Sequence, residues 1–143
     1  MIFNYFGLIF FCIIMIPNIV YSVKCREGFE NKWKNKPVEL LEQIGRYGCM
    51  CFMILIVPIL GAGIPTGNAL AVYLSVDSFL VLMYCLLWIV LWNSKGLLRA
   101  FSLSIIPSVI FLFCGIMTHY ILLIITALIF APAHIFISYK NAE

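Results

Sequence analysis

The sequence predicts an all-α integral membrane protein: a polytopic bundle of about five transmembrane helices, with the N-terminus outside and the C-terminus in the cytoplasm. Two features of composition predict the class, since 64% of the 143 residues are hydrophobic and only 10% are charged. A soluble domain usually has about 25% charged residues, and a soluble core of this size could not bury so much apolar surface. The third feature is the length of the uncharged stretches, because a helix needs about 20 apolar residues to cross the hydrocarbon core.

The uncharged stretches divide into five predicted spans. Residues 1–23 hold one span, and residues 47–94, in which Asp77 is the single charged residue, hold two. Residues 100–139 have no charged side chain, and one helix of that length would be roughly 60 Å long, about twice the hydrocarbon thickness. The chain must therefore fold back there, most simply near residues 115–119. The predicted spans, in a single transmembrane domain over residues 1–143, are 4–23, 47–63, 69–92, 99–116 and 119–139.

The positions of the basic residues predict the orientation. Of the nine Lys and Arg residues, six lie within residues 24–46, two lie within residues 95–99 and the last is Lys140. Five spans put these three segments on one side, and the positive-inside rule makes that side the cytoplasm. Four spans would break the alternation. We therefore expect a multi-pass protein of the plasma membrane.

The alternative for the first span is a signal peptide that is cleaved near Ser22. The stretch before the apolar run has no basic residue, and no A-x-A-like cleavage site follows it. Cleavage would also place the Lys-rich loop outside the cell, so we favour a membrane span.

Residues 24–46 form the predicted cytoplasmic loop, and it ends in an amphipathic helix over about residues 37–46. Glu42 and Arg46 make a favourable i, i+4 pair on its polar face. Apolar residues recur on the other face at helical spacing: Val38, Leu41, Ile44 and Tyr47. We expect this helix to lie on the membrane surface and to bend into the second span near Gly45.

Aromatic and basic residues precede this helix and allow two interpretations. The favoured one is a membrane-surface anchor, in which basic side chains meet anionic headgroups and aromatic rings lie at the interface. The alternative is a docking surface for a soluble partner. The residues concerned are Phe29, Lys32, Trp33, Lys34 and Lys36.

Two short stretches carry a resemblance. Gly-Phe-Glu-Asn-Lys-Trp at residues 28–33 and Leu-Leu-Glu-Gln-Ile-Gly-Arg-Tyr-Gly-Cys at residues 40–49 resemble a segment of small uncharacterised multispanning bacterial membrane proteins. The resemblance runs along most of the chain. It implies a multispanning fold and carries no activity.

Asp77 is the single acidic residue within a predicted span and is the candidate for binding an ion or a proton. A carboxylate near the bilayer centre costs about 2.5–3.5 kcal/mol, so it should face the protein interior or a water-filled cavity. Its stripe of the helix also carries Tyr73, Tyr84, Trp88 and Trp92. One interpretation is a proton or cation site in a polar path, and the other is a carboxyl group that fixes helix packing.

Four further polar residues are candidates for contacts between helices: His134, Asn18, Ser75 and Ser78. His134 shares a helical face with Ala127 and Ala131, so it should point at another helix, where a hydrogen bond is its favoured role. Asn18 is its expected neighbour, because the first and fifth spans run in the same direction. Ser75 and Ser78 belong to a stripe of small residues that would allow close helix contact.

The sequence has no motif for a known activity. It lacks a glycine-rich phosphate loop, H-E-x-x-H and G-x-S-x-G. Cys49 and Cys51, spaced i, i+2, point to different sides of a helix and make a poor metal pair. The net charge of +3 is accounted for by the topology signal, which argues against nucleic-acid binding. We therefore expect no enzyme, no cofactor and no metal site.

Two functions follow as hypotheses. The first is a non-enzymatic membrane component: an accessory subunit, a scaffold or a small homo-oligomer, with the lipid bilayer, further copies or another membrane protein as partners. The alternative is a small transporter or channel subunit in which Asp77 is the proton- or cation-sensitive group. An intramembrane enzyme is a distant third.

Overall fold

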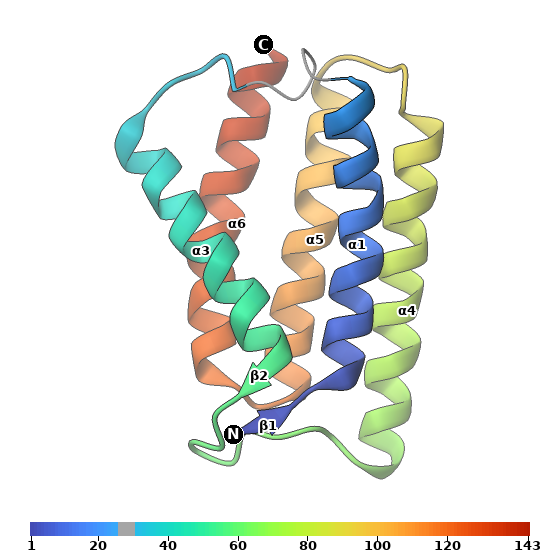
Figure 1. Cartoon of the computed structure of the whole chain (residues 1–143), viewed down its shortest axis with the longest axis vertical. Coiled ribbons are helices and arrows are strands. Elements are labelled where there is room, and N and C mark those ends of the chain that lie inside the picture. Colours follow the sequence, from blue (N-terminus) through green and yellow to red (C-terminus); the bar gives the residue numbers. More distant parts are fainter. Residues whose placement is uncertain (26–30) are drawn as a thin grey trace.

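The computed structural model describes residues 1–25 and 31–143. In this part of the chain five helices run between the two ends of one bundle (Figure 1). They are α1 (Tyr5–Lys24), α3 (Lys36–Ile54), α4 (Gly67–Val90), α5 (Leu97–Met117) and α6 (Ile121–Ala142). The all-helical prediction is therefore confirmed. Four of the helices, α1, α4, α5 and α6, are long and apolar enough to cross a membrane.

The boundaries of those four helices lie within three residues of the predicted spans. The uncharged stretch over residues 100–139 folds back as expected, because α5 ends at Met117 and α6 begins at Ile121. His119 in the turn between them has a left-handed backbone with φ of 51°. The segment before Gly67 is a loop, and it is rich in Gly and Pro, which favour turns.

The region of the second span differs from the prediction. We expected a surface helix over residues 37–46 and a span over residues 47–63, but a single helix, α3, continues through Gly45 and ends at Ile54. Gly45 does not break the helix. It allows close approach to α6, since a Cβ at this position would lie 2.6 Å from the backbone nitrogen of Phe130. The chain then becomes extended before Pro58, which disfavours helical geometry in the preceding residue.

The extended segment after α3 pairs with the N-terminus of the chain. β1 (Ile2–Phe3) and β2 (Leu55–Ile56) form a two-stranded antiparallel ladder in which Ile2 faces Ile56. This ladder joins the start of α1 to the end of α3, and it was not predicted.

The polar face of α3 packs on a neighbouring helix, whereas we expected that face to be solvated. Leu41, Ile44 and Tyr47 are exposed, whereas Glu42 and Gly45 are buried. A helix that lies on a membrane surface turns its apolar face to lipid and its polar face to water, but the polar face of α3 packs extensively along α6. Its small and polar residues face the neighbouring helix, and its large apolar residues face outward, where lipid would solvate them.

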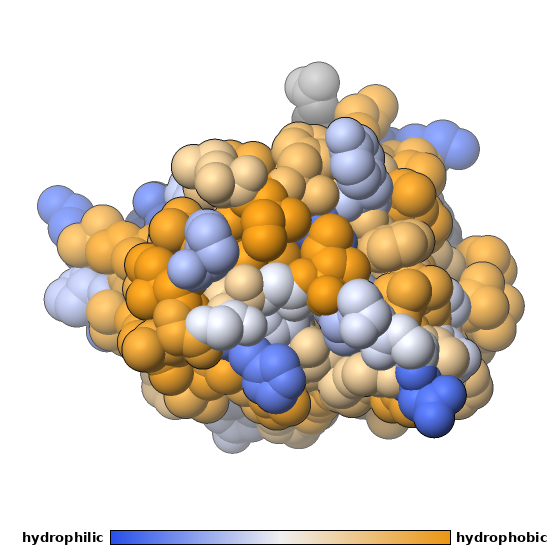
Figure 2. Space-filling model, turned by 90° about the horizontal axis from the view of Figure 1, so that it is seen from below, coloured by the Kyte–Doolittle hydropathy of each residue, from blue (hydrophilic) through white to orange (hydrophobic). Residues whose placement is uncertain are grey.

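The helices pack in a defined order. α6 lies between α3 and α5, α5 also packs on α4, and α1 packs on α4 and α3 (Figure 1). One end of the bundle gathers the end of α1, the start of α3, the α4–α5 connection and the C-terminus. The other end holds the N-terminus, the β ladder and the α5–α6 turn, and its surface is largely apolar with scattered hydrophilic residues (Figure 2).

Candidate functional site

Asp77 lies in the interior of the bundle, as its helical stripe predicted. It is fully buried on α4, on the face that also buries Tyr73, Val81 and Tyr84. Neither carboxyl oxygen has a hydrogen-bond partner among the described residues. An ionised carboxylate without partners is very costly in such a place, so this geometry favours a neutral carboxyl group.

A chain of polar groups connects the helices one turn away from Asp77. Asn4 is fully buried, and its Oδ1 accepts a hydrogen bond from the first turn of α1. Its Nδ2 donates to the Met53 carbonyl oxygen at 3.1 Å and to the Tyr73 hydroxyl at 3.2 Å. The Tyr73 hydroxyl in turn lies 3.3 Å from Sγ of Cys114 on α5. The sequence analysis missed Asn4, although an Asn directly before an apolar helical run is a recognisable N-cap.

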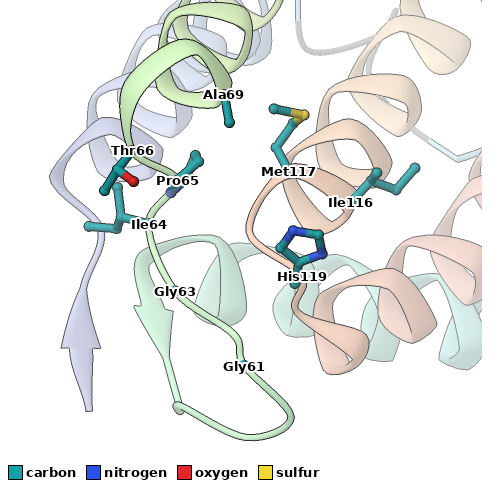
Figure 3. A pocket seen from close by; sticks show the side chains of 9 residues that line it. All are labelled: Gly61, Gly63, Ile64, Pro65, Thr66, Ala69, Ile116, Met117 and His119. Atoms are coloured by element: carbon teal, nitrogen blue, oxygen red, sulfur yellow. The ribbon is translucent and has the colours of Figure 1, made fainter.

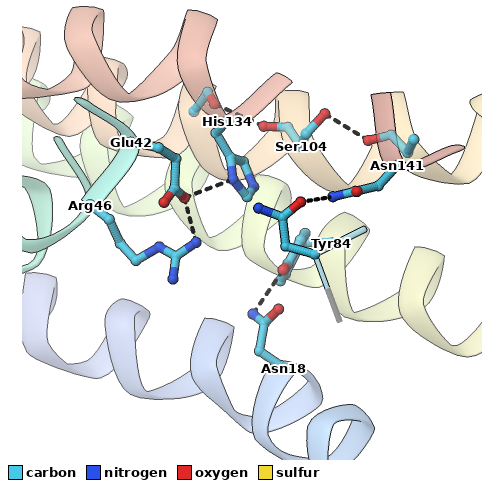
Figure 4. A network of polar contacts seen from close by, with 10 residues as sticks. Asn18, Glu42, Arg46, Tyr84, Ser104, His134 and Asn141 are labelled. Atoms are coloured by element: carbon cyan, nitrogen blue, oxygen red, sulfur yellow. Dashed lines mark hydrogen bonds and ion pairs between the residues drawn. The ribbon is translucent and has the colours of Figure 1, made fainter. Parts of the chain in front are cut away.

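A second polar cluster joins α3 to α6 (Figure 4). Nδ1 of His134 donates to Oε1 of Glu42 at 3.1 Å, and Arg46 donates to the same oxygen. The side chains of Glu42, His134 and Arg46 are 6%, 24% and 42% exposed, respectively. The buried carboxylate is therefore compensated by two donors, one of which reaches toward the surroundings of the protein.

The sequence analysis found the Glu42–Arg46 pair but placed it on a solvated face. The signal that could have located the cluster is the stripe that Glu42 shares with Gly45 and Cys49, at steps of three and four. Small residues at such spacing indicate a face that packs closely on another helix.

The expected pairing of Asn18 with His134 is wrong. Nδ2 of Asn18 donates to the Tyr84 hydroxyl at 2.8 Å, which links α1 to α4 (Figure 4). His134 does point at another helix, as expected, but that helix is α3 and the partner is Glu42. The helices α1 and α6 run in the same direction but do not pack on each other as main neighbours. α1 packs mainly on α4, and α6 packs mainly on α3 and α5.

The serine candidates on α4 do not lie in the interior as a pair. Ser75 is exposed and Ser78 is half-buried, so the close helix contact that we expected of the Ser75 stripe stays a prediction for a helix outside this chain. The buried face of α4 is formed by its larger side chains, among them Tyr73, Tyr84 and Trp88. The small residues were left on the outer side.

The predicted surface anchor is tied to the end of α6. The backbone nitrogens of Lys32 and Trp33 each donate to Oδ1 of Asn141 at 3.0 Å. The ring of Trp33 packs edge-on against Phe136, with centroids 5.2 Å apart. Lys32, Lys34 and Lys36 are exposed at this end of the bundle, and Phe29 lies outside the described residues.

A hollow of about 410 Å³ lies at the opposite end of the bundle, between the loop after β2 and the α5–α6 turn (Figure 3). Apolar side chains and loop backbone form most of its wall. His119 is the ionisable residue in the lining, and it is exposed. No group of three or more potential metal ligands occurs among the described residues.

Comparison of the chain with protein-family models, curated proteins and solved structures finds no match. Its function is therefore inferred from the chemistry of the chain itself.

Proposed function

We propose that the chain is a five-span protein of the cell membrane, with its N-terminus outside and its C-terminus in the cytoplasm. The last turn of α1 with Lys24, the start of α3 with Lys36, the α4–α5 connection with Lys95 and the last turn of α6 with Lys140 lie at one end of the bundle, which supports a cytoplasmic location for that end (Figure 1). Leu41 and Ile44 of α3 face outward, which supports a membrane position for α3 as well, despite the charged residues of this helix.

Cysteine accessibility tests this orientation. In a background without native cysteines, Asn68→Cys places a thiol near the start of α4 and Lys95→Cys places one in the α4–α5 turn, and both positions are exposed. An impermeant maleimide added to intact cells should label the Asn68→Cys variant, and it should label the Lys95→Cys variant only after permeabilisation. The reverse pattern would overturn the orientation.

Within the membrane, we infer a non-enzymatic role as an accessory subunit, a scaffold or a protomer of a small homo-oligomer. The observation that carries this inference is the filled centre of the bundle. Bulky side chains that are fully buried occupy it, among them Met53, Tyr73, Ile110 and Leu123. Backbones also approach closely: a Cβ at Gly7 would lie 2.1 Å from the Met53 carbonyl oxygen. Such packing favours a structural component over a protomer with its own transport path.

The exposed small residues of α4 support assembly with another membrane helix. Ala71 and Ser75 lie on its outer face, where a partner helix could approach closely. Extraction into lipid nanodiscs, followed by mass measurement, tests the proposal. A defined assembly heavier than the 16.3 kDa chain is expected, and Ser75→Phe should reduce its mass while the helical circular-dichroism signal stays unchanged. A lone chain that conducts ions would contradict the proposal.

A transporter or channel subunit remains the second candidate because of one observation. Both oxygens of Asp77 are buried without a hydrogen-bond partner among the described residues, and intramembrane acids often serve proton or ion pathways. The polar chain from Tyr73 to Asn4 leads from the neighbourhood of Asp77 toward the N-terminal end of the bundle. If the chain is a transporter or channel subunit, Asp77→Asn should abolish proton or cation flux without loss of folded protein.

A further inference from the structure

An apolar groove runs along the outside of the bundle between α1 and α4, which lie side by side in Figure 1. It has a volume of about 280 Å³ and its lining is entirely hydrophobic in residue type. Ile16 and Ile89 on its walls are 60% and 72% exposed, so the groove is open to the surroundings of the protein. Residues from both helices form it, among them Ile16, Pro17, Val20, Cys85, Ile89 and Trp92.

The groove leads toward the basic end of the bundle. Ile13, Pro17 and Val20 of the lining recur at helical spacing, and the next position of that row on α1 is Lys24. Lys24 is exposed in the last turn of the helix. On the other wall, Trp92 lies three residues before Lys95, which is also exposed.

Contacts at this end bring the two walls together. The rings of Tyr21 and Trp92 are 5.1 Å apart, and each residue lies three positions before one of the two lysines. Arg99, from α5, donates to the Tyr21 hydroxyl at 2.9 Å and to the Ser94 carbonyl oxygen at 3.1 Å. Its guanidinium also lies 5.3 Å from the ring centroid of Trp88, a groove residue. Arg99 therefore lies at this end of the groove, and Lys24 and Lys95 each follow, by three residues, an aromatic residue of the Tyr21–Trp92 contact.

We propose that this groove binds one acyl chain of an anionic phospholipid, with the headgroup phosphate near Lys24 and Lys95. The apolar walls suit a hydrocarbon chain, tryptophan prefers the level of the headgroups, and basic residues at that level attract anionic lipids. Arg99 holds the α4–α5 turn, which carries Lys95, against α1.

The positive charge at the basic end favours a lipid over a helix from a second copy in this groove, whereas the helix contact proposed for assembly lies at Ala71 and Ser75, in the other half of α4. A second copy in the same membrane has the same orientation, so its own basic end would lie at the same level. Its lysines would add positive charge where this chain already has three cations. An anionic headgroup is complementary to that cluster, whereas a parallel helix of this chain is not.

Tryptophan fluorescence provides a test, because Trp88 and Trp92 line the groove. The chain has three tryptophans, and a Trp33→Phe background leaves these two as reporters. The protein is reconstituted in phosphatidylcholine vesicles that contain a small fraction of brominated phosphatidylglycerol or the same fraction of brominated phosphatidylcholine. The groove should bind brominated phosphatidylglycerol more tightly than brominated phosphatidylcholine, by roughly fivefold for each lysine that contacts the headgroup. The anionic lipid should therefore quench the tryptophan fluorescence more strongly.

The matched variants separate the site from general surface charge. Lys24→Gln with Lys95→Gln should remove most of the preference, whereas Lys34→Gln with Lys140→Gln, which also removes two basic residues from this end, should keep it. If the double variant loses its helical circular-dichroism signal, Lys95→Gln alone, in an exposed turn, is compared with the control variant instead, and it should also reduce the preference for the anionic lipid. Equal quenching by the two lipids would show ordinary lipid contact only, and weak quenching by both would show a groove covered by another helix. Either result would overturn the proposal.

Discussion

Nδ1 of His134 on α6 donates a 3.1 Å hydrogen bond to Oε1 of Glu42 on α3, across 92 residues of sequence. Glu42 is almost fully buried, and Arg46 donates to the same oxygen. Among the described helices, α3 falls outside the four that are apolar enough to span a membrane alone. The contact therefore gives Glu42 a polar partner on α6 and leaves the apolar residues of α3 for lipid.

We expect Glu42 and His134 to be energetically coupled. Glu42→Ala, His134→Ala and the double variant should give a coupling of about 0.5–3 kcal/mol in the free energy of unfolding, because each single change removes the same hydrogen bond. Denaturation of the detergent-solubilised protein, followed by circular dichroism, measures it. The control pair is Asn18→Ala with His134→Ala, which should be additive since Asn18 bonds to Tyr84 instead. Additivity in both pairs would show that the Glu42–His134 hydrogen bond contributes nothing to the free energy of unfolding.

The close approach of α3 and α6 should not tolerate a side chain at Gly45. Gly45→Leu would put a Cβ 2.6 Å from the Phe130 backbone, and overpacking of this kind typically costs about 1–3 kcal/mol. Cys51→Leu, at an exposed position of the same helix, adds bulk without this clash and should leave the melting temperature nearly unchanged. Equal melting temperatures for the two variants would mean that the helices are not packed at Gly45.

Asn4 should be a stabilising residue despite its place at the chain end. Asn4→Ala removes the cap of α1 and leaves the buried Met53 carbonyl oxygen without that donor. A lost N-cap alone costs about 1 kcal/mol, and an unsatisfied buried group adds to it. Thermal unfolding compares this variant with Asn68→Ala, an exposed asparagine near the start of α4. A larger loss for Asn68→Ala would contradict the assigned network.

Asp77 should be replaceable by an apolar residue if its role is packing. Asp77→Leu removes a buried carboxyl group that has no hydrogen-bond partner among the described residues, so the free energy of unfolding should rise by about 1–3 kcal/mol. Asn68→Leu, the same kind of change at an exposed site on α4, should have little effect. Strong destabilisation by Asp77→Leu would mean that the carboxyl group has a partner that stabilises the fold.

Four helices were predictable because long uncharged stretches specify membrane-length helices almost by composition alone. The inward orientation of Asp77 was predictable for a related reason, since an acid in a span must avoid lipid. α3 was not predictable in the same way. Its Lys36, Glu39, Glu42 and Arg46 resemble a surface helix, and the packing of Gly45 on Phe130 shows which face is inside.

The pairing of polar residues was least predictable. Asn18 and His134 each have a partner on another helix, but helical periodicity gives only the face of a side chain and not the neighbour that it meets. The stripe of small residues on α4 faces outward at Ser75, because the larger aromatic side chains of this helix fill the interior.

Ion flux through proteoliposomes tests the central claim most directly. Proton and monovalent-cation flux is measured for the wild type and for Asp77→Asn at equal protein density, with empty liposomes as the baseline. A packed, non-enzymatic component predicts that both proteins stay at the baseline. Flux in the wild type that is absent from Asp77→Asn would contradict the claim and make the chain a transporter or channel subunit with its site on α4.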